Sequence, residues 1–358
     1  MSSIRGSRSR TQVPARHSTA VALLLALVLA GVTACSSGAV GGSGSGSGIP
    51  RATLQRDYQA TIAKALPSVV EIDAGKTTGS GVVFDRKGDI VTNAHVVGTL
   101  KKFDVRVSVT SDTLKARLVG LFTPDDLAVI RVTKGGSALR PVRWADSSKA
   151  QIGQIVLAMG SPYGLTDSVT QGIVSATGRT VTGPAISGQP PTLIINAIQT
   201  SAAINPGNSG GALVLLSGYV LGIPTLTATD PDLGGSAQGI GFAIPSDTAV
   251  DIARQLIEHG KVIRSDRASL DIEGETHINS SDKPNGVTVD AARPGGAAAK
   301  AGIKPGDVIV GVAGSPAADV AQLENLLARY QPEDRVKVEL LRNGNPREVL
   351  VTLGSLTS

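Results

Sequence analysis

Aromatic residues are scarce in this sequence: Phe, Trp and Tyr together make up 3% of its 358 residues. Proteins that stack single-stranded nucleic acid need exposed aromatic rings, so this function is disfavoured. Most of the chain also lacks an excess of positive charge. The net charge is +5, but residues 1–34 carry four arginines and no acid, and without them 30 basic residues face 29 acidic ones. We therefore expect no nucleic-acid partner.

Cysteine occurs only once, at Cys35, so the chain can form no internal disulfide. Its domains must then be stable by packing alone. The four histidines and the acidic residues show no metal-ligand spacing. The sequence therefore predicts no metal site.

The amino-terminal segment has the layout of a secretory signal. A basic stretch, Arg5–Arg16, precedes an apolar run, Thr19–Ala30. This run is shorter than the roughly 20 residues that a membrane-spanning helix needs. It is followed by Val-Thr-Ala-Cys35, which resembles a bacterial lipobox. The resemblance implies that residues 1–34 are a signal peptide and that Cys35 is lipidated.

Residues 35–50 are rich in Ser and Gly, which is typical of a flexible tether. We expect the protein to lie outside the cytoplasm, held on a membrane surface by the lipid on Cys35. The alternatives are a soluble secreted protein or a short uncleaved anchor, with Cys35 incidental.

The rest of the chain divides into two parts with different patterns. Residues 51–264 contain many short β-branched runs between Gly, Pro, Asn and Asp, which indicates a sandwich or barrel. One clear helix follows Pro245, with Ser246 as its expected N-cap and Gly260 at its end. Residues 268–354 combine strand-like runs with an amphipathic helix near 318–330, as in a small α+β domain.

Three motifs in the first part carry residues suited to nucleophilic catalysis. They are Thr-Asn-Ala-His95-Val-Val, Asp-Asp126-Leu-Ala-Val-Ile and Asn-Pro-Gly-Asn-Ser209-Gly-Gly. A serine hydroxyl becomes a good nucleophile when a histidine takes its proton and a carboxylate orients that histidine. The order His, Asp, Ser is that of the double β-barrel hydrolases.

With these motifs the chain resembles the HtrA (Deg) family of serine proteases, and the resemblance covers nearly all of it beyond the tether. It implies a mostly β fold, with a trypsin-like double β-barrel at 51–264 followed by a PDZ domain at 268–354. It further implies that His95 is the general base, Asp126 the orienting carboxylate and Ser209 the nucleophile. No metal or other cofactor is implied.

The resemblance also assigns binding roles around the nucleophile. The oxyanion hole would be formed by the N–H groups of Gly207 and Ser209, with Asn208 between them. Ile240, Gly241, Phe242 and Ala243 would pair with an extended substrate as an added strand. Ala203 and Ile204 would line the specificity pocket. Because these two carry no charge, we expect cleavage after small or medium apolar residues.

In the second part, Ser269-Leu270-Asp271-Ile272 resembles the carboxylate-binding loop of a PDZ domain. Such domains bind peptide C-termini in a groove between a strand and a helix. The family normally has Gly where Asp271 stands, so a like charge beside the peptide carboxylate would weaken binding. The alternative is a small packing domain without a ligand.

The family resemblance further implies a homotrimer that degrades unfolded or regulatory proteins and is activated through mobile loops. The candidate loops are residues 178–191 and 225–238, which are rich in Gly, Pro and small polar residues. Two departures from the family pattern, Ser201 and Ala212, concern the nucleophile loop. Ser201 and Asp271 leave a second hypothesis open: a chaperone-like scaffold that binds peptides without cutting them.

Overall fold

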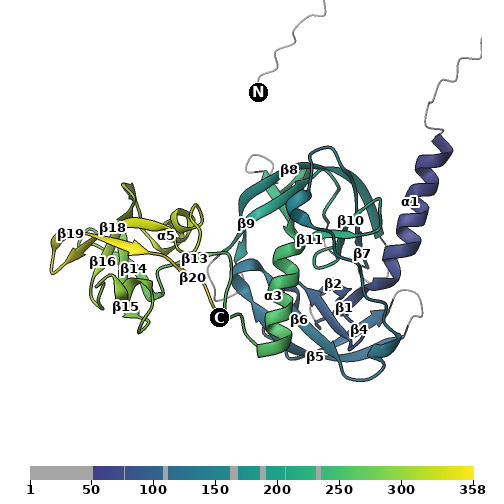
Figure 1. Ribbon diagram of the computed structural model, residues 1–358, viewed down its shortest axis with the longest axis horizontal. Coiled ribbons are helices and arrows are strands. Elements are labelled where there is room, and N and C mark those ends of the chain that lie inside the picture. Colours follow the sequence, from purple (N-terminus) through teal and green to yellow (C-terminus); the bar gives the residue numbers. More distant parts are fainter. Residues whose placement is uncertain are drawn as a thin grey trace, which may run out of the picture. The chain divides into compact units, whose positions relative to one another are not determined.

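The computed structural model describes residues 51–75, 77–107, 112–161, 168–185, 191–205, 207–230 and 235–358 (Figure 1). The described residues all belong to one compact unit, residues 50–358. Within these residues, no helix has both the length and the apolar character needed to cross a membrane.

Six strands form a first closed barrel in the order β1-β2-β3-β6-β5-β4. Their side chains alternate, and the inward-facing ones are mostly Val and Ile; Ile72, Ile90 and Ile130, for example, are fully buried. The strands are β1 (Val69–Asp73), β2 (Thr78–Val83), β3 (Asp89–Thr92), β4 (Lys102–Val107), β5 (Thr113–Phe122) and β6 (Leu127–Val132).

A second closed barrel has the order β10-β11-β12-β9-β8-β7. Leu157, Met159 and Ile223 of this barrel share one buried cluster with Val82 and Val129 of the first. The two barrels therefore pack through a common apolar core. The strands are β7 (Ile155–Gly160), β8 (Ser168–Ala185), β9 (Pro191–Thr200), β10 (Ala212–Leu215), β11 (Val220–Asp230) and β12 (Gly235–Pro245).

Helices and short helical turns cover and connect the barrels. The predicted helix after the second barrel is present as α3 (Ser246–His259), and Gly260 ends it with a φ of 71°. The N-cap is Pro245, however, because the Ser246 hydroxyl donates to the Ala145 carbonyl instead. Helix α1 (Arg51–Ala65) was not predicted, since its sequence is largely polar. The remaining segments are α2 (Ala94–Val97), η1 (Leu66–Ser68), η2 (Thr123–Asp125), η3 (Gly136–Ala138) and η4 (Ser147–Lys149).

The carboxy-terminal part is an α+β domain with its own apolar core, as the sequence predicts. The expected amphipathic helix is shorter than predicted, because Asp319 caps it by accepting from the Gln322 N–H. The elements are β13 (Ala268–Ser269), β14 (Ile272–Ile278), β15 (Pro284–Ala292), α4 (Ala297–Lys300), β16 (Val308–Val312), β17 (Ser315–Pro316), α5 (Val320–Leu327), β18 (Arg335–Arg342), β19 (Asn345–Thr352) and β20 (Gly354–Ser355).

Candidate active site

Asp126 lies where a short turn meets strand β6. The turn η2 ends at Asp126, whose backbone is left-handed with a φ of 52°. This conformation is uncommon for a non-glycine residue but is accessible to Asp. It turns the Asp126 carbonyl toward the start of α2, where it accepts from the Ala94 N–H at 3.0 Å and from Asn93 Nδ2 at 2.9 Å. The backbone therefore fixes the carboxylate beside the helix that carries His95.

The Asp126 carboxylate holds His95 by two hydrogen bonds. Its Oδ2 lies 2.7 Å from His95 Nδ1, and its Oδ1 accepts from the His95 backbone N–H at 2.9 Å. Thr225 Oγ1 also donates to Oδ2, at 2.5 Å. The Asp126 side chain is 3% exposed and the His95 side chain 24%. With Nδ1 donating to the carboxylate, Nε2 of the neutral ring is left as a proton acceptor.

The loop that carries Ser209 packs against Ser80 of β2 and against the end of β3, just before His95. The Ser209 carbonyl accepts from the Ser80 N–H at 2.9 Å, and the Gly207 carbonyl accepts from Ser80 Oγ at 2.5 Å. A side chain at Gly210 would come within 2.4 Å of Thr92 Oγ1. The fold thus brings Ser209 to the same place as His95 and Asp126. Among the described residues, no hydrogen bond joins the Ser209 hydroxyl to the His95 ring.

Two backbone amides of this loop have no hydrogen-bond acceptor among the described residues, as an oxyanion hole requires. In the described parts of the chain, the N–H groups of Gly207 and Ser209 donate to no protein acceptor. The Asn208 N–H, in contrast, donates to the Asn205 carbonyl at 3.2 Å. The Asn208 side chain braces the loop by donating to Ala203 O and accepting from Asn205 N. Asn208 is therefore a support of the loop and not a hole donor.

The prediction that Ile240–Ala243 would take up a substrate strand is wrong. Strand β12 pairs with β11 on one side and with β9 on the other at Gly241, Phe242 and Ala243. Because both edges are occupied, no further strand can add here. Phe242 and Ala243 are also buried, at 8% and 0% exposure.

The two residues expected to line the specificity pocket differ in their exposure to solvent. Ala203 is exposed, whereas Ile204 is 5% exposed and packs with the second barrel. Ile204 also faces Gly241, where an added Cβ would lie 2.4 Å from Ile204 Cγ1. Ile240 is 37% exposed. Each of these side chains is apolar, so they provide no charge that would select a basic or acidic substrate residue.

The predicted peptide-binding loop of the second domain borders a cavity of about 540 Å³. Its walls come from α5 and from the loop and strand that begin at Ser269, and also from Thr123, Pro124, Thr192 and Leu193 of the first domain. The lining includes Ser269, Leu270, Ile272, Val320, Leu323 and Leu327, together with Glu324, whose pKa is raised by burial.

Asp271, however, turns its side chain away from this cavity. Its Oδ2 accepts from the Ala297 N–H at the start of α4, at 3.1 Å, and its Oδ1 lies 3.4 Å from Arg293 Nη1. Its φ of 56° is the left-handed conformation that explains the usual glycine at this position. The expected repulsion between this carboxylate and a peptide carboxylate therefore has no support in the geometry.

Several predicted features lie outside the described residues. They are the signal peptide at residues 1–34, the tether at 35–50 with Cys35, and the central parts of the two candidate mobile loops, residues 186–190 and 231–234. Sequence reasoning, conversely, missed Thr225 and the bracing role of Ser80. A threonine or serine in a strand gives no pattern that distinguishes it from ordinary strand composition.

Two barrels around a histidine, an aspartate and a serine define the class of trypsin-like peptidases. The family model of the trypsin-like peptidase domain matches residues 79–223, and that of the PDZ domain matches residues 266–353. The periplasmic pH-dependent serine endoprotease DegQ of Escherichia coli K12 is 39% identical over 287 residues, which are 78% of this chain and 60% of DegQ. The serine protease Do-like HtrA of Lactococcus lactis is 38% identical over 294 residues, covering 78% of this chain and 71% of that protein.

Solved structures agree with this assignment. The serine endoprotease from Yersinia pestis is 36% identical, with a TM-score of 0.54, and the match covers 84% of this chain and 98% of that one. The HtrA-type protease AlgW, solved with a decapeptide, is 30% identical with a TM-score of 0.54 and the same coverage. The chain belongs to the HtrA family of serine proteases. It spans about 60% of the length of DegQ.

Proposed function

We propose that this protein is an extracytoplasmic serine endopeptidase that cleaves misfolded or regulatory proteins. The observation that carries the proposal is the His95–Asp126 pair beside the Ser209 loop with its two free amides. The relatives named as a serine endoprotease and a serine protease support it further.

In the proposed reaction, Ser209 Oγ attacks the scissile carbonyl carbon and its proton passes to His95 Nε2. Asp126 stabilises the resulting imidazolium. The carbonyl oxygen becomes an oxyanion that accepts from the N–H groups of Gly207 and Ser209, each worth about 3 kcal/mol. His95 then protonates the leaving amine, and water hydrolyses the acyl-enzyme by the same steps.

A fluorophosphonate probe tests the proposal. The full chain should be labelled in the presence of an unfolded substrate, and Ser209→Ala should abolish the labelling. If the folded chain is not labelled and still binds the substrate, the alternative holds, and the protein is a peptide-binding scaffold.

The substrate strand is proposed to pair with β11 instead of β12. Among the described strands, β11 pairs with β10 only as far as Gly222, and beyond it pairs with β12 alone. Its free edge begins near Thr225, which contacts the catalytic Asp126. With Ala203 and Ile204 beside it, we expect cuts after small or medium apolar residues. Mass-spectrometric mapping of an unfolded substrate tests this, and cuts mostly after Lys or Arg would contradict it.

The second domain is proposed to bind peptide C-termini at Ser269–Ile272, in the cavity beside α5. A peptide with a free carboxylate should bind and its amidated form should not. Equal binding of both forms, or of neither, would contradict this assignment.

The protein is proposed to be tethered through lipid on Cys35 and to form a homotrimer. Membrane fractionation tests the tether, because Cys35→Ser should release the chain into the soluble fraction.

Sedimentation equilibrium of the domains from residue 51 onward tests the trimer. A monomeric mass at micromolar concentration would contradict it.

A further inference from the structure

Arg267, in the segment between the two domains, inserts its guanidinium beside the turn that carries the catalytic aspartate. Its Nη1 donates to the Pro124 carbonyl at 2.5 Å, to Asp125 Oδ1 at 3.1 Å and to the Leu193 carbonyl at 2.6 Å. Arg267 is 8% exposed and Asp125 is 4% exposed. The contact is therefore a buried ion pair with two additional carbonyl acceptors.

The three acceptors belong to two elements that border the active site. Pro124 and Asp125 form the end of η2, and the next residue is Asp126. Leu193 belongs to β9, which runs to Thr200 at the start of the nucleophile loop. Arg267 thus joins the catalytic-acid turn to the second barrel, one residue from the group that orients His95.

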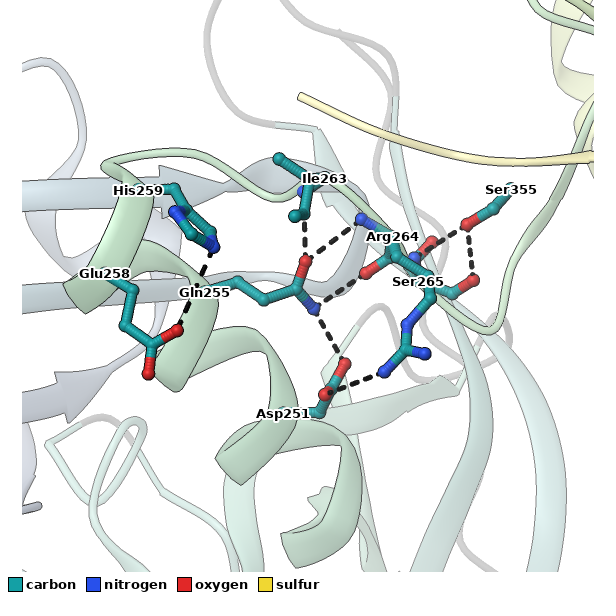
Figure 2. Close-up of polar contacts among 8 residues, drawn as sticks. All are labelled: Asp251, Gln255, Glu258, His259, Ile263, Arg264, Ser265 and Ser355. Carbon is teal, nitrogen blue, oxygen red and sulfur yellow. Dashed lines mark hydrogen bonds and ion pairs between the residues drawn. The ribbon is translucent and has the colours of Figure 1, made fainter.

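The backbone that carries Arg267 is itself fixed on the first domain. Gln255 of α3 accepts from the N–H groups of Ile263 and Arg264 at 3.0 Å and donates to the Arg264 carbonyl and to Asp251 Oδ2 at 2.8 Å (Figure 2). Gln255 is 9% exposed and uses both of its polar atoms in this way.

The chain's last residues hold the same segment from the other side. Ser265 N–H donates to Ser355 Oγ at 2.7 Å, and the Ser355 hydroxyl lies 2.7 Å from the Ser265 carbonyl (Figure 2). The Leu356 N–H donates to the Arg267 carbonyl at 2.8 Å. The segment that carries Arg267 is therefore held by hydrogen bonds on both sides and is not a free linker.

We propose that Arg267 is a positioning residue of the catalytic site: by binding η2 and β9 together, it holds the left-handed turn at Asp126 in the conformation that orients His95. The inference rests on the proposed triad. The charged groups near Asp125 fit this role. Asp266 and Asp126 repel the Asp125 carboxylate, Arg267 attracts it, and burial is the largest cause of its raised pKa. Of these charged groups, Arg267 alone stabilises the ionised carboxylate of Asp125.

The test compares Arg267→Lys and Arg267→Gln with Arg342→Lys, which alters a half-buried Arg–Asp pair in the carboxy-terminal domain. We expect Arg267→Gln to lower kcat about 10- to 100-fold, with KM within about twofold, because small displacements of catalytic groups have effects of that size. Arg267→Lys keeps the charge but loses the fork of donors, and should be intermediate. Arg342→Lys should leave kcat unchanged.

A second readout separates positioning from simple destabilisation. The low-field NMR resonance of the proton between His95 Nδ1 and Asp126 should broaden or shift in the Arg267 variants and stay unchanged in Arg342→Lys. Rates are expressed per folded molecule, measured by circular dichroism. The double variant Asp125→Asn with Arg267→Gln removes the unpaired buried charge, so it should fold even if the single variant does not.

Two outcomes distinguish this inference from the proposed function. If Asp126→Asn does not lower kcat, the triad assignment itself is wrong. If Asp126→Asn lowers kcat while both the folded Arg267 variants and the double variant retain the wild-type kcat and NMR resonance, the triad stands and the positioning role of Arg267 is overturned.

Discussion

At the scale of single residues, Asp126 is the most heavily constrained group in the candidate active site. Its carbonyl and both carboxylate oxygens have hydrogen-bond partners, and Thr225 provides one from the opposite barrel. A carboxylate that is held from several directions keeps its partner histidine in one orientation. Thr225 is therefore expected to contribute to catalysis although it does not touch the substrate's reacting atoms.

Replacing Thr225 with Val removes the donor to Asp126 while keeping the branched shape. Because a hydrogen bond to a charged group contributes about 1.5–3 kcal/mol, kcat/KM should fall roughly 10- to 100-fold. Steady-state kinetics with a peptide substrate measures this. Thr225→Ser keeps the hydroxyl and should retain most of the activity. A Thr225→Val protein with wild-type kcat/KM would contradict the role given to Thr225.

Asp271 illustrates how a side chain can be compatible with a loop that usually carries glycine. The left-handed backbone is needed for the loop, and Asp tolerates it better than most residues. Its carboxylate then binds the N–H at the start of α4 and Arg293, away from the groove.

Asp271→Asn should therefore change the Kd of a C-terminal peptide by less than about twofold, since the carboxylate does not face the cavity and its removal relieves no repulsion. Fluorescence anisotropy with a labelled peptide measures this. Binding that becomes tenfold tighter in the Asn variant would mean that the carboxylate does face the bound peptide.

At the scale of elements, the two barrels are closed, but β11 extends beyond the residues at which it pairs with β10. Among the described strands, this difference in length leaves one edge of β11 unpaired next to the candidate active site, whereas β12 is internal. In the carboxy-terminal domain, a half-buried ion pair connects the turn before β16 to the end of β18. Arg342 Nε and Nη2 each donate to Asp307 at 2.7 Å, and Asp307 also accepts from the Lys304 N–H.

This pair makes a definite prediction about acid stability. The hydrogen bonds from Arg342 hold the pKa of Asp307 below its ordinary value. A lowered pKa means that the stabilisation is fully present above the ordinary pKa of about 3.9 and is lost as pH falls through the lowered value. Urea unfolding between pH 7 and pH 2.5 should show that Asp307→Asn is less stable than wild type at pH 7 and loses less stability on acidification. Parallel losses in both proteins would contradict this.

At the scale of the whole molecule, the segment that leaves the first domain and the last residues of the chain return to the same place. β13 pairs with β20, Val262 and Ser358 bind one another, and Leu356 packs against the core of the barrels. The two domains are thus joined by two strands of chain and not by one flexible linker.

Deleting residues 354–358 should therefore destabilise the joint as well as the second domain. The hydrogen bonds lost there contribute about 1 kcal/mol each, so we expect a loss of roughly 3–5 kcal/mol in unfolding free energy. Chemical denaturation measures this. Leu356→Ala, which removes only the apolar contact, should have a smaller effect. A deletion variant as stable as wild type would show that the returning strand does not stabilise the joint.

Some features were predictable because they depend on local sequence. Strand and barrel character follows from short β-branched runs between turn residues, and α5 follows from its apolar periodicity. The residues His95, Asp126 and Ser209 carry recognisable neighbours, and the fold brings them to one place. The helix α1 was missed because its buried face is narrow: among its residues with described side chains, only Thr61 and Ala65 are buried.

Other features were decided only by the tertiary structure. That β12 is internal, that Asn208 is a support and that Asp271 turns away from the groove each depend on which partner a backbone or polar group finds in the folded chain. Thr225 and Arg267 reach the turn at Asp125 and Asp126 across 99 and 142 positions of sequence. Sequence patterns report the apolar periodicity that drives local structure and burial, whereas a hydrogen bond depends on the position and direction of both partners, which only the folded chain provides.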